Sequence, residues 1–338
     1  MTQTVEDPDI GPVIAPDVGL PADGGGPGLL PTAPRGAFPR MTSGLRSALR
    51  ELWSDKAGFF GAVILLGIVL MAIFAPWLVP HDPAAQSLSD RLQPPFWLDG
   101  GTTDHILGTD NLGRDVLSRL ITGSRISLFV GVAVCLFAGT VGVVLGLIAG
   151  YRGGKTDSVI MRVVDTQVAF PGLLLALIIL AVVGPSVTSV VVVLGVNGWM
   201  VYARITRGTV LSVRETPYVE AAEIVGCKPR RVVFKHILPN LASPLLTLGI
   251  LEFARIVLAE AALSYLGLGV QPPQTSWGLD VSIGKDYMYN AWWLVTFPGI
   301  AIAITVLSVN LVASWLRVAA DPEARDKRFA SQSRPSAA

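Results

Sequence analysis

The feature that most constrains the fold is a series of long apolar segments. A helix needs about 20 apolar residues to cross the hydrocarbon core of a bilayer. Charged residues make up only 15% of this chain and hydrophobic residues 51%, whereas an ordinary soluble domain is about 25% charged. The sequence therefore predicts an all-α polytopic membrane protein with six transmembrane helices. The apolar segments lie at about 58–79, 126–149, 163–183, 187–202, 241–268 and 291–316.

The distribution of basic residues predicts the orientation. With six spans, both termini lie on one side together with the connections at 151–162 and 203–240, and these parts carry most of the lysines and arginines. Parts rich in Lys and Arg stay in the cytoplasm. We therefore expect a multi-pass protein of the inner (plasma) membrane with both termini cytoplasmic. The opposite side holds Arg91, Arg114, Arg119, Arg125 and Lys285.

Composition divides the chain into five parts. The N-terminal residues are rich in Pro and Gly and poor in large apolar side chains, which predicts disorder. They do not resemble a signal peptide, because the first apolar run begins only near Gly58. The expected parts are a disordered cytoplasmic tail with a basic juxtamembrane segment (1–57), a first transmembrane helix (58–79), an external loop (80–125), a core domain of five transmembrane helices (126–318) and a cytoplasmic tail (319–338).

Several kinds of site are not predicted. A formal charge of +1 gives no signature of a nucleic-acid partner. Two cysteines are too few for a disulfide framework, and the three histidines show no metal-ligand spacing. Residues 149–156 fit a relaxed phosphate-loop pattern, but they follow a membrane-length apolar run and not a short buried strand. We therefore expect no metal, no nucleotide and no other cofactor on this chain, and no catalytic residues.

The segment 217–240 is the most informative of the polar connections. Pro217 suits the first turn of a helix, Gly226 suits a helix C-terminus, and Pro229 suits the start of a second short helix. This pattern predicts a compact helix-turn-helix, in which the small Ala221 and Ala222 allow close approach by another surface. The alternative is an amphipathic linker held at the membrane surface by lipid phosphates, and the pattern alone favours neither.

Residues Glu220-Ala221-Ala222, with Gly226 and Leu238-Pro239 after them, resemble the EAA loop of the membrane subunits of ABC importers. The resemblance extends from about His105 to Asp321 and is most similar to the second, C-type, permease subunit of the dipeptide/oligopeptide/nickel importer family. It implies the type I ABC importer permease fold. The further segments that carry it are Leu107-Gly108-Thr109-Asp110, Gly113-Arg114-Asp115-Val116, Ala169-Phe170-Pro171, Ala259-Glu260-Ala261 and the run at 266–273.

The resemblance implies a division of labour between several chains. A paralogous permease subunit would complete a heterodimeric pathway in the bilayer, two ATPase subunits would use ATP and Mg²⁺, and an external binding protein would deliver peptides or similar solutes. This chain would hydrolyse nothing itself, and it would dock on an ATPase subunit through its EAA loop. The residues implied in that docking are Glu220, Ala221, Ala222, Gly226, Arg230, Arg231, Leu238 and Pro239.

Two other function classes are weighed against this one. A secondary transporter driven by an ion gradient is the leading alternative, and internally repeated broken spans would favour it. An intramembrane enzyme would need a nucleophile, base or metal set that the sequence does not offer.

Three ionisable residues lie within the apolar segment at 241–268. Glu252 and Arg255 are three residues apart, so they share a helix face and can pair, and Glu260 lies two turns further along. An ionised group in a membrane helix needs a partner or water. Two interpretations stay open: an ion pair that fixes helix packing, or a face that lines the pathway and meets the charged ends of a solute.

Overall fold

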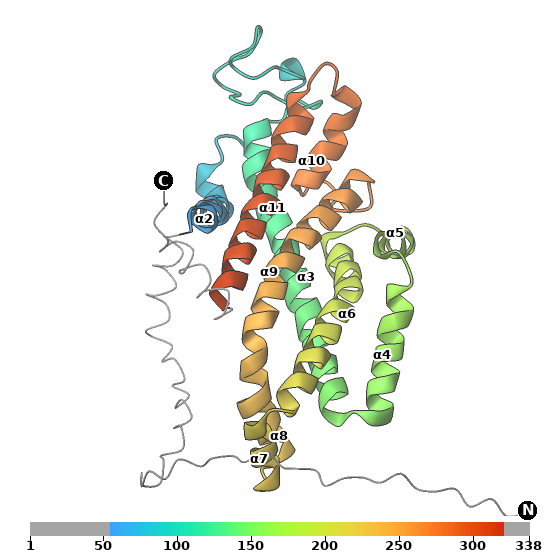
Figure 1. Ribbon diagram of the computed structural model, residues 1–338. Helices are drawn as coiled ribbons and strands as arrows, with labels where there is room; N and C mark the ends of the chain where they lie inside the picture. The colour runs from blue at the N-terminus through green and yellow to red at the C-terminus, as the bar shows by residue number, and fades with distance from the viewer. Residues whose placement is uncertain (1–54, 321–338) are drawn as a thin grey trace, which may run out of the picture. The chain divides into compact units, whose positions relative to one another are not determined.

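A computed structural model describes residues 55–320 of the chain. These residues are mostly helical and contain no β-strand, only an isolated bridge between Thr109 and Asp115. The all-α fold class predicted from the sequence is thereby confirmed (Figure 1). Most of the expected tails, 1–57 and 319–338, lie outside the described residues.

Five helices, or continuous helix runs, are long and apolar enough to cross a membrane. They are α2 (Lys56–Leu78), α3 (Val116–Arg152), α6 (Val187–Arg214), the run from α8 (Pro229–Val232) through the π-helical η2 (Val233–Ile237) into α9 (Leu238–Tyr265), and α11 (Trp293–Ala320). The remaining elements are α4 (Gly154–Val168), α5 (Gly172–Val183), α7 (Pro217–Ile224), α10 (Trp277–Gly284) and the short 3-10 turns η1 (Leu88–Asp90) and η3 (Lys285–Tyr287).

The third predicted span, at 163–183, is not one straight helix. It is divided between α4 and α5, whose axes differ by 85°, so the chain has six spans only if this bent pair is one of them. The break lies at Ala169-Phe170-Pro171, and Pro171 itself has an extended backbone (φ −60°, ψ 113°). Proline disfavours helical geometry in the residue before it and donates no backbone hydrogen bond, so the helix stops although the apolar run continues.

Two helices extend beyond their predicted apolar segments. α3 already begins at Val116, within the stretch 80–125 expected to be a loop, because Asp115 caps it: its carboxylate accepts a hydrogen bond of 2.7 Å from the backbone N–H of Ser118. α6 continues to Arg214, past the expected end near 202. A helix does not have to end where its apolar face meets water, so apolar runs underestimate its length.

The centre of the bundle is the packing of α3 against α6 and α9 (Figure 1). Gly142, Gly146 and Gly150 form a line along α3, one turn apart, and a Cβ atom on any of them would collide with α6. Small residues at this spacing let two helices approach to backbone contact. α2 crosses on the other side and packs on α11, where Gly58 and Gly61 face Trp315 and Leu311.

We name the two ends of the bundle by the helices that lie there. The α7 end carries α7, α8 and the turn between α3 and α4, and the α10 end carries the segment 79–115 and α10 (Figure 1). α3 runs from the α10 end to the α7 end. The candidate functional residues are divided between these ends and the groove between them.

Candidate functional site

The segment 217–237 folds as the helix-turn-helix that its sequence predicts. Pro217 occupies the first turn of α7, and Pro229 occupies the first turn of α8. Gly226 lies between them with φ +84°, a left-handed conformation that glycine adopts at little cost. The π-helical η2 follows, where the N–H of Leu238 donates to the carbonyl of Val233, five residues back. We call residues 217–237 the α7 foot.

The base of the α7 foot is buried. Val219, Val232 and Ile237 are fully covered and form one hydrophobic cluster with Val210 of α6 and Leu241 of α9. One side of each short helix therefore belongs to the core of the bundle, which fixes the orientation of the foot.

Polar contacts also hold the foot. Arg214 donates to the carbonyl oxygens of Gly150 (3.2 Å) and Tyr151 (2.9 Å) at the end of α3. Its guanidinium lies 5.3 Å from the centre of the Tyr151 ring, and the Tyr151 hydroxyl donates to Glu223 of α7 at 3.5 Å. Asn240 donates to the hydroxyl of Tyr218 at 3.0 Å. These contacts tie the foot to α3 and α9, and they tie the end of α6, from which the foot follows, to α3.

The outer side of the α7 foot is exposed and partly apolar. Ile224 and Val225 at its tip are 86% and 82% exposed, and Phe234 is 67% exposed. Among the residues expected to dock on an ATPase, Ala222 and Leu238 are half-buried and the others are exposed; those are Glu220, Ala221, Gly226, Arg230, Arg231 and Pro239. Most of the expected residues are therefore accessible, and Ile224 and Val225, which sequence reasoning missed, are exposed with them.

Glu252 and Arg255 form the ion pair that their spacing predicts. Arg255 Nε lies 2.8 Å from Glu252 Oε2, and its Nη2 lies 2.5 Å from the same oxygen. The Glu252 side chain is 10% exposed and that of Arg255 is 53% exposed. In this pair the carboxylate is buried and the guanidinium is accessible.

Glu260 does not join this pair. Its side chain is fully buried and accepts hydrogen bonds from the hydroxyls of Ser264 (2.7 Å), Ser276 (2.9 Å) and Ser127 (3.4 Å). These serines belong to α9, to the residue before α10, and to α3. The carboxylate therefore faces the protein interior and connects three parts of the chain near the α10 end.

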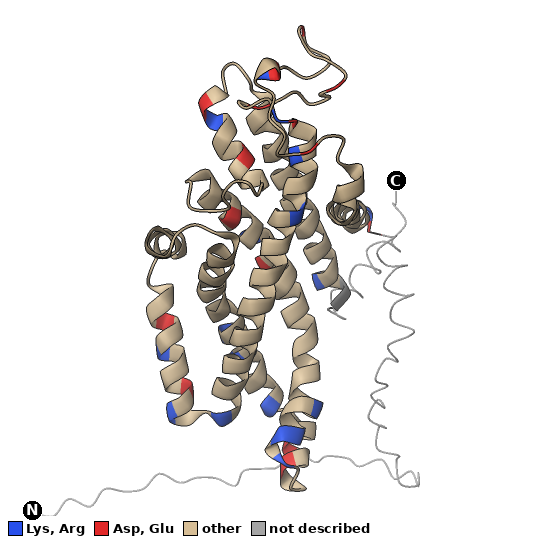
Figure 2. Cartoon of the chain, turned by 180° about the vertical axis from the view of Figure 1, so that it is seen from behind, with Lys and Arg blue, Asp and Glu red and all other residues tan. Residues whose placement is uncertain are grey.

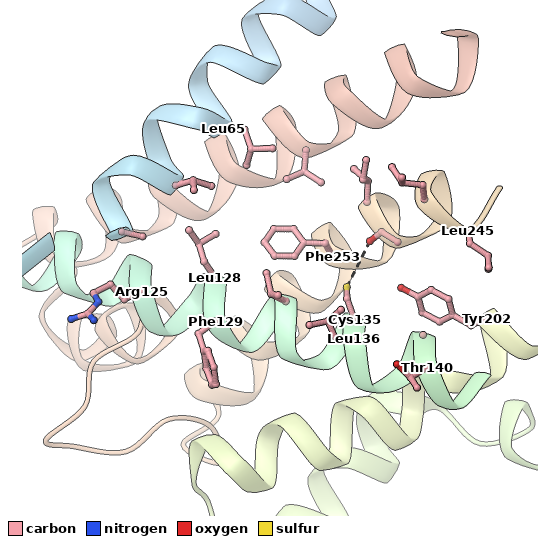
Figure 3. A pocket seen from close by; sticks show the side chains of 18 of the residues that line it. Leu65, Arg125, Leu128, Phe129, Cys135, Leu136, Thr140, Tyr202, Leu245 and Phe253 are labelled. Atoms are coloured by element: carbon pink, nitrogen blue, oxygen red, sulfur yellow. Dashed lines mark hydrogen bonds between the residues drawn. The ribbon is translucent and has the colours of Figure 1, made fainter. Parts of the chain in front are cut away.

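A wide apolar groove runs between α2, α3 and α9. Its volume is about 1450 Å³. Figure 3 shows Phe129, Leu136 and Phe253 among its lining side chains, and Cys135, whose thiol donates to the carbonyl of Gly249 at 3.7 Å. Arg125 contributes a basic group to the lining (Figure 3). The groove suits acyl chains or an apolar helix better than a charged solute.

Ion pairs tie the α10 end together. Arg114 Nε donates to Asp110 at 2.6 Å, and Arg119 pairs with Asp280, 161 positions away in the sequence. Burial raises the pKa of the Asp280 carboxyl, and the guanidinium of Arg119 opposes that rise. In the sequence, residues 107–116 are notable only for their resemblance to the importer family, and no local pattern identifies Asp280 as the partner of Arg119.

Comparison with known proteins shows which class of membrane transport protein has this fold. A family profile described as binding-protein-dependent transport system inner membrane component matches residues 142–326, and one described as the N-terminal TM domain of oligopeptide transport permease C matches residues 43–95. Among solved structures, inward-facing conformations of the MetNI methionine ABC transporter match with a TM-score of 0.50 and 18% identity, covering 60% of this chain and 96% of that chain. The fold is that of an ABC importer permease.

Individual relatives show which branch of the importer permeases this chain is similar to. The di/tripeptide transport system permease protein DppC of Pseudomonas aeruginosa is 40% identical over 284 residues, which cover 83% of this chain and 94% of that protein. The dipeptide transport system permease protein DppC of Escherichia coli is 44% identical over 279 residues, which cover 81% of this chain and 93% of that protein. The chain belongs to the family of binding-protein-dependent inner-membrane transport components, in its C-type peptide permease branch.

Proposed function

We propose that this chain forms half of the translocation pathway of an importer for peptides such as di- and tripeptides, and that it is driven by separate ATPase subunits through the α7 foot. The peptide class rests on relatives named for dipeptide and di/tripeptide transport, which align over 81–83% of the chain. The observation that carries the coupling role is the apolar, exposed tip at Ile224 and Val225 on a buried base.

The tip has the chemistry of a docking surface. Two adjacent branched apolar side chains are left in the open on a short helix end, and a groove on a partner would cover them. The small Ala221 and Ala222 allow close seating, while Glu220, Arg230 and Arg231 supply charges at the rim. Gly226 permits the turn that presents the tip.

Coupling then works as a lever. Closure of an ATPase pair on ATP displaces the docked tip. The foot transmits the displacement because it is fixed to α3 by Tyr151, to α9 by Asn240 and to α6 by the hydrophobic cluster that includes Val210. Rigid-body movement of those helices exchanges inward-open and outward-open states. In this arrangement nucleotide and Mg²⁺ are bound by the ATPase subunits, and this chain is a transporter subunit and not an enzyme.

The remaining partners follow from the same arrangement. A paralogous permease subunit forms the other half of the pathway as a heterodimer, and a substrate-binding protein docks at the α10 end. The two permease subunits lie in the inner membrane.

The charge distribution supports an orientation with the α7 end in the cytoplasm. Lysines and arginines gather around that end (Figure 2), including Arg152, Lys155, Arg230 and Lys235. At the α10 end, Arg114 and Arg119 are neutralised by Asp110 and Asp280. The larger number of lysines and arginines at the α7 end favours that side as the cytoplasmic one.

We also propose that the Glu252–Arg255 pair contributes to the pathway. Arg255 is half-exposed on a helix of the central bundle, and Glu252 beneath it holds the guanidinium in place. An accessible guanidinium held in this way can bind the carboxylate of a peptide. Glu260, which sequence analysis grouped with this pair, is assigned instead to holding the α10 end together, because three hydroxyls enclose it.

The test of coupling is Ile224→Asp in the complete complex reconstituted in proteoliposomes with its ATPase subunits. A charge at this exposed position leaves the core of the permease intact but opposes seating in an apolar groove. We expect ATP-dependent uptake of dipeptides to fall at least about tenfold, since a loss of about 1.4 kcal/mol in docking already gives that factor. Association of the ATPase subunits with the purified permease should weaken with it.

Leu88→Asp is the matched control, because Leu88 is 74% exposed but lies at the α10 end. It should leave ATPase association unchanged. Normal association and uptake by Ile224→Asp would rule out the coupling role of the foot. Uptake of peptide by the permease alone, driven by an ion gradient without ATP, would instead favour the secondary-transporter alternative, in which a broken span such as α4–α5 carries the ion site.

A further inference from the structure

Three potential metal ligands converge at the α10 end. His81 lies just after α2, His105 lies in the segment 79–115, and Asp115 is the residue that caps α3. One ligand atom from each of the three side chains lies within 4.8 Å of the other two. His105 Nδ1 is 3.0 Å from Asp115 Oδ1, and His81 Nδ1 is 3.9 Å from Asp115 Oδ2. Tetrahedral binding at about 2.0–2.1 Å from each ligand needs separations of about 3.4 Å, which small side-chain rotations provide here.

The carboxylate is held in place by groups around it. Ser118, which is fully buried, donates to Asp115 Oδ2 from its backbone N–H at 2.7 Å and from its hydroxyl at 2.6 Å. The same hydroxyl accepts from the backbone N–H of His81 at 3.1 Å. One serine therefore positions two of the three ligand-bearing residues, which is the outer-shell support that protein metal sites have.

One imidazole ring is enough to give the Asp115 carboxylate a hydrogen-bonded partner, and this group contains two. Asp115 pairs closely with His105. Within residues 55–320 the ring of His81 forms no hydrogen bond, and it lies beside the His105 ring at a tilt of 43°, with centres 4.9 Å apart. Burial is graded, with Asp115 1% exposed, His105 14% and His81 41%. The group is thus closed on the protein side and open toward solvent at His81, which leaves an entry path and a place for a water ligand.

We propose that His81, His105 and Asp115 bind a divalent transition-metal ion of the Zn²⁺ type at the α10 end. Two imidazoles and a carboxylate are a donor set that suits zinc and its neighbours, and not Ca²⁺ or Mg²⁺, which prefer oxygen ligands alone. This proposal differs from the expectation from sequence that the chain holds no metal.

The metal would have a mechanical effect. His81 follows the end of α2 by three residues, and Asp115 begins α3, so a bound ion joins these two helices across a connection of more than thirty residues. α2 and α3 are two walls of the apolar groove (Figure 3). The ion therefore fixes the position of one groove wall relative to the other.

The experiment measures metal binding by the full chain in its purified complex, carrying an affinity tag without histidine. Zn²⁺ content is measured after equilibrium dialysis, and Co²⁺ is titrated as a spectroscopic probe of coordination. We expect one ion per chain, and a Co²⁺ absorption spectrum typical of a tetrahedral site. His81→Ala and His105→Ala should each weaken binding more than about 100-fold, and Ser118→Ala, which removes only the outer-shell hydroxyl, about 10–100-fold.

Two variants separate binding from folding. Asp115→Asn keeps a good cap for α3 but loses the anionic ligand, so the complex should remain folded with weakened binding. His236→Ala removes the one histidine outside the group and should bind as the unmodified chain does. The proposal fails if the unmodified complex binds no stoichiometric Zn²⁺, or if binding survives His81→Ala and His105→Ala unchanged. Because the readout is binding and not uptake, this outcome is independent of the transport proposal.

Discussion

Among single residues, Glu260 shows how an acid is kept inside a membrane bundle. Within residues 55–320 no basic side chain hydrogen-bonds to it, and three serine hydroxyls satisfy its oxygens instead. Ser276 also caps α10, and Ser264 also accepts from the backbone N–H of Val270. The carboxylate thus organises the connection from α9 to α10, where the chain returns toward α11.

Glu260→Ala should destabilise the protein by about 1–3 kcal/mol for each hydroxyl left without a partner. Glu260→Gln should stay close to the unmodified protein, because an amide accepts and donates hydrogen bonds in the same space. Thermal unfolding of the purified permease in detergent measures both. Equal losses for the two variants would contradict the hydrogen-bonding account.

Among elements, the close packing of α3 on α6 is what makes the bundle rigid. The glycine line at 142, 146 and 150 removes side chains from the contact, and the backbone of α6 fills the space. Tyr202 and Ala203 of α6 are buried in the same contact. The proposed coupling needs helices that move as a rigid body, and the α3–α6 contact provides this rigidity next to the α7 foot.

Gly146→Leu should therefore lower stability by about 1–3 kcal/mol or more, because its side chain would collide with Ala203 and Thr206 of α6. Gly67→Leu on α2 is the matched control, since nothing lies within 4 Å of a Cβ atom there. The measurement is the unfolding temperature of each purified variant. Similar unfolding temperatures for the two variants would show that the α3–α6 contact tolerates a large side chain at position 146.

At the scale of the whole molecule, the proposed orientation rests on the difference in charge between the α7 end and the α10 end. Within residues 55–320, Arg152, Lys155, Arg230 and Lys235 near the α7 end form no ion pair, whereas Arg114 and Arg119 at the α10 end pair with Asp110 and Asp280. The tips of both ends are well exposed, with Ile224 at one and Tyr289, 93% exposed, at the other. The two positions are therefore suited to single-cysteine labelling.

In a chain whose Cys135 and Cys227 are replaced by alanine, Tyr289→Cys should react with a membrane-impermeant maleimide added to intact spheroplasts. Ile224→Cys should react only after the membrane is permeabilised. The extent of labelling on a gel gives the result. The reverse pattern would place the α7 end outside the cell and would contradict docking on a cytoplasmic ATPase.

Sequence predicted those features that local rules determine. Bilayer thickness makes apolar length informative, so most spans were found, and the turn at Gly226 between two proline-started helices is a local pattern too. The break at Pro171 was missed because the apolar run continues through it. The pairing of Arg119 with Asp280 could not be predicted, because their contact depends on how α10 packs on α3.

The three proposed metal ligands illustrate the same limit. His81, His105 and Asp115 are separated by stretches of irregular chain, so no fixed spacing signals them. Only the folded segment 79–115 brings them together, around the capping residue of α3. Sequence reasoning finds ligands that share a helix or a turn, and it does not find ligands assembled by a loop.

The bent pair α4–α5 has a consequence for how the chain is made. α4 carries Asp157 and Asp165, and their partners Arg207 and Arg204 lie on α6, which is synthesised later. When α4 leaves the ribosome, Asp157 and Asp165 lack the arginine partners that they have in the folded chain, and a helix with these charges is costly to release into lipid. We therefore expect α4 to reach its final position only after translation has delivered α6, so that the two helices pack together.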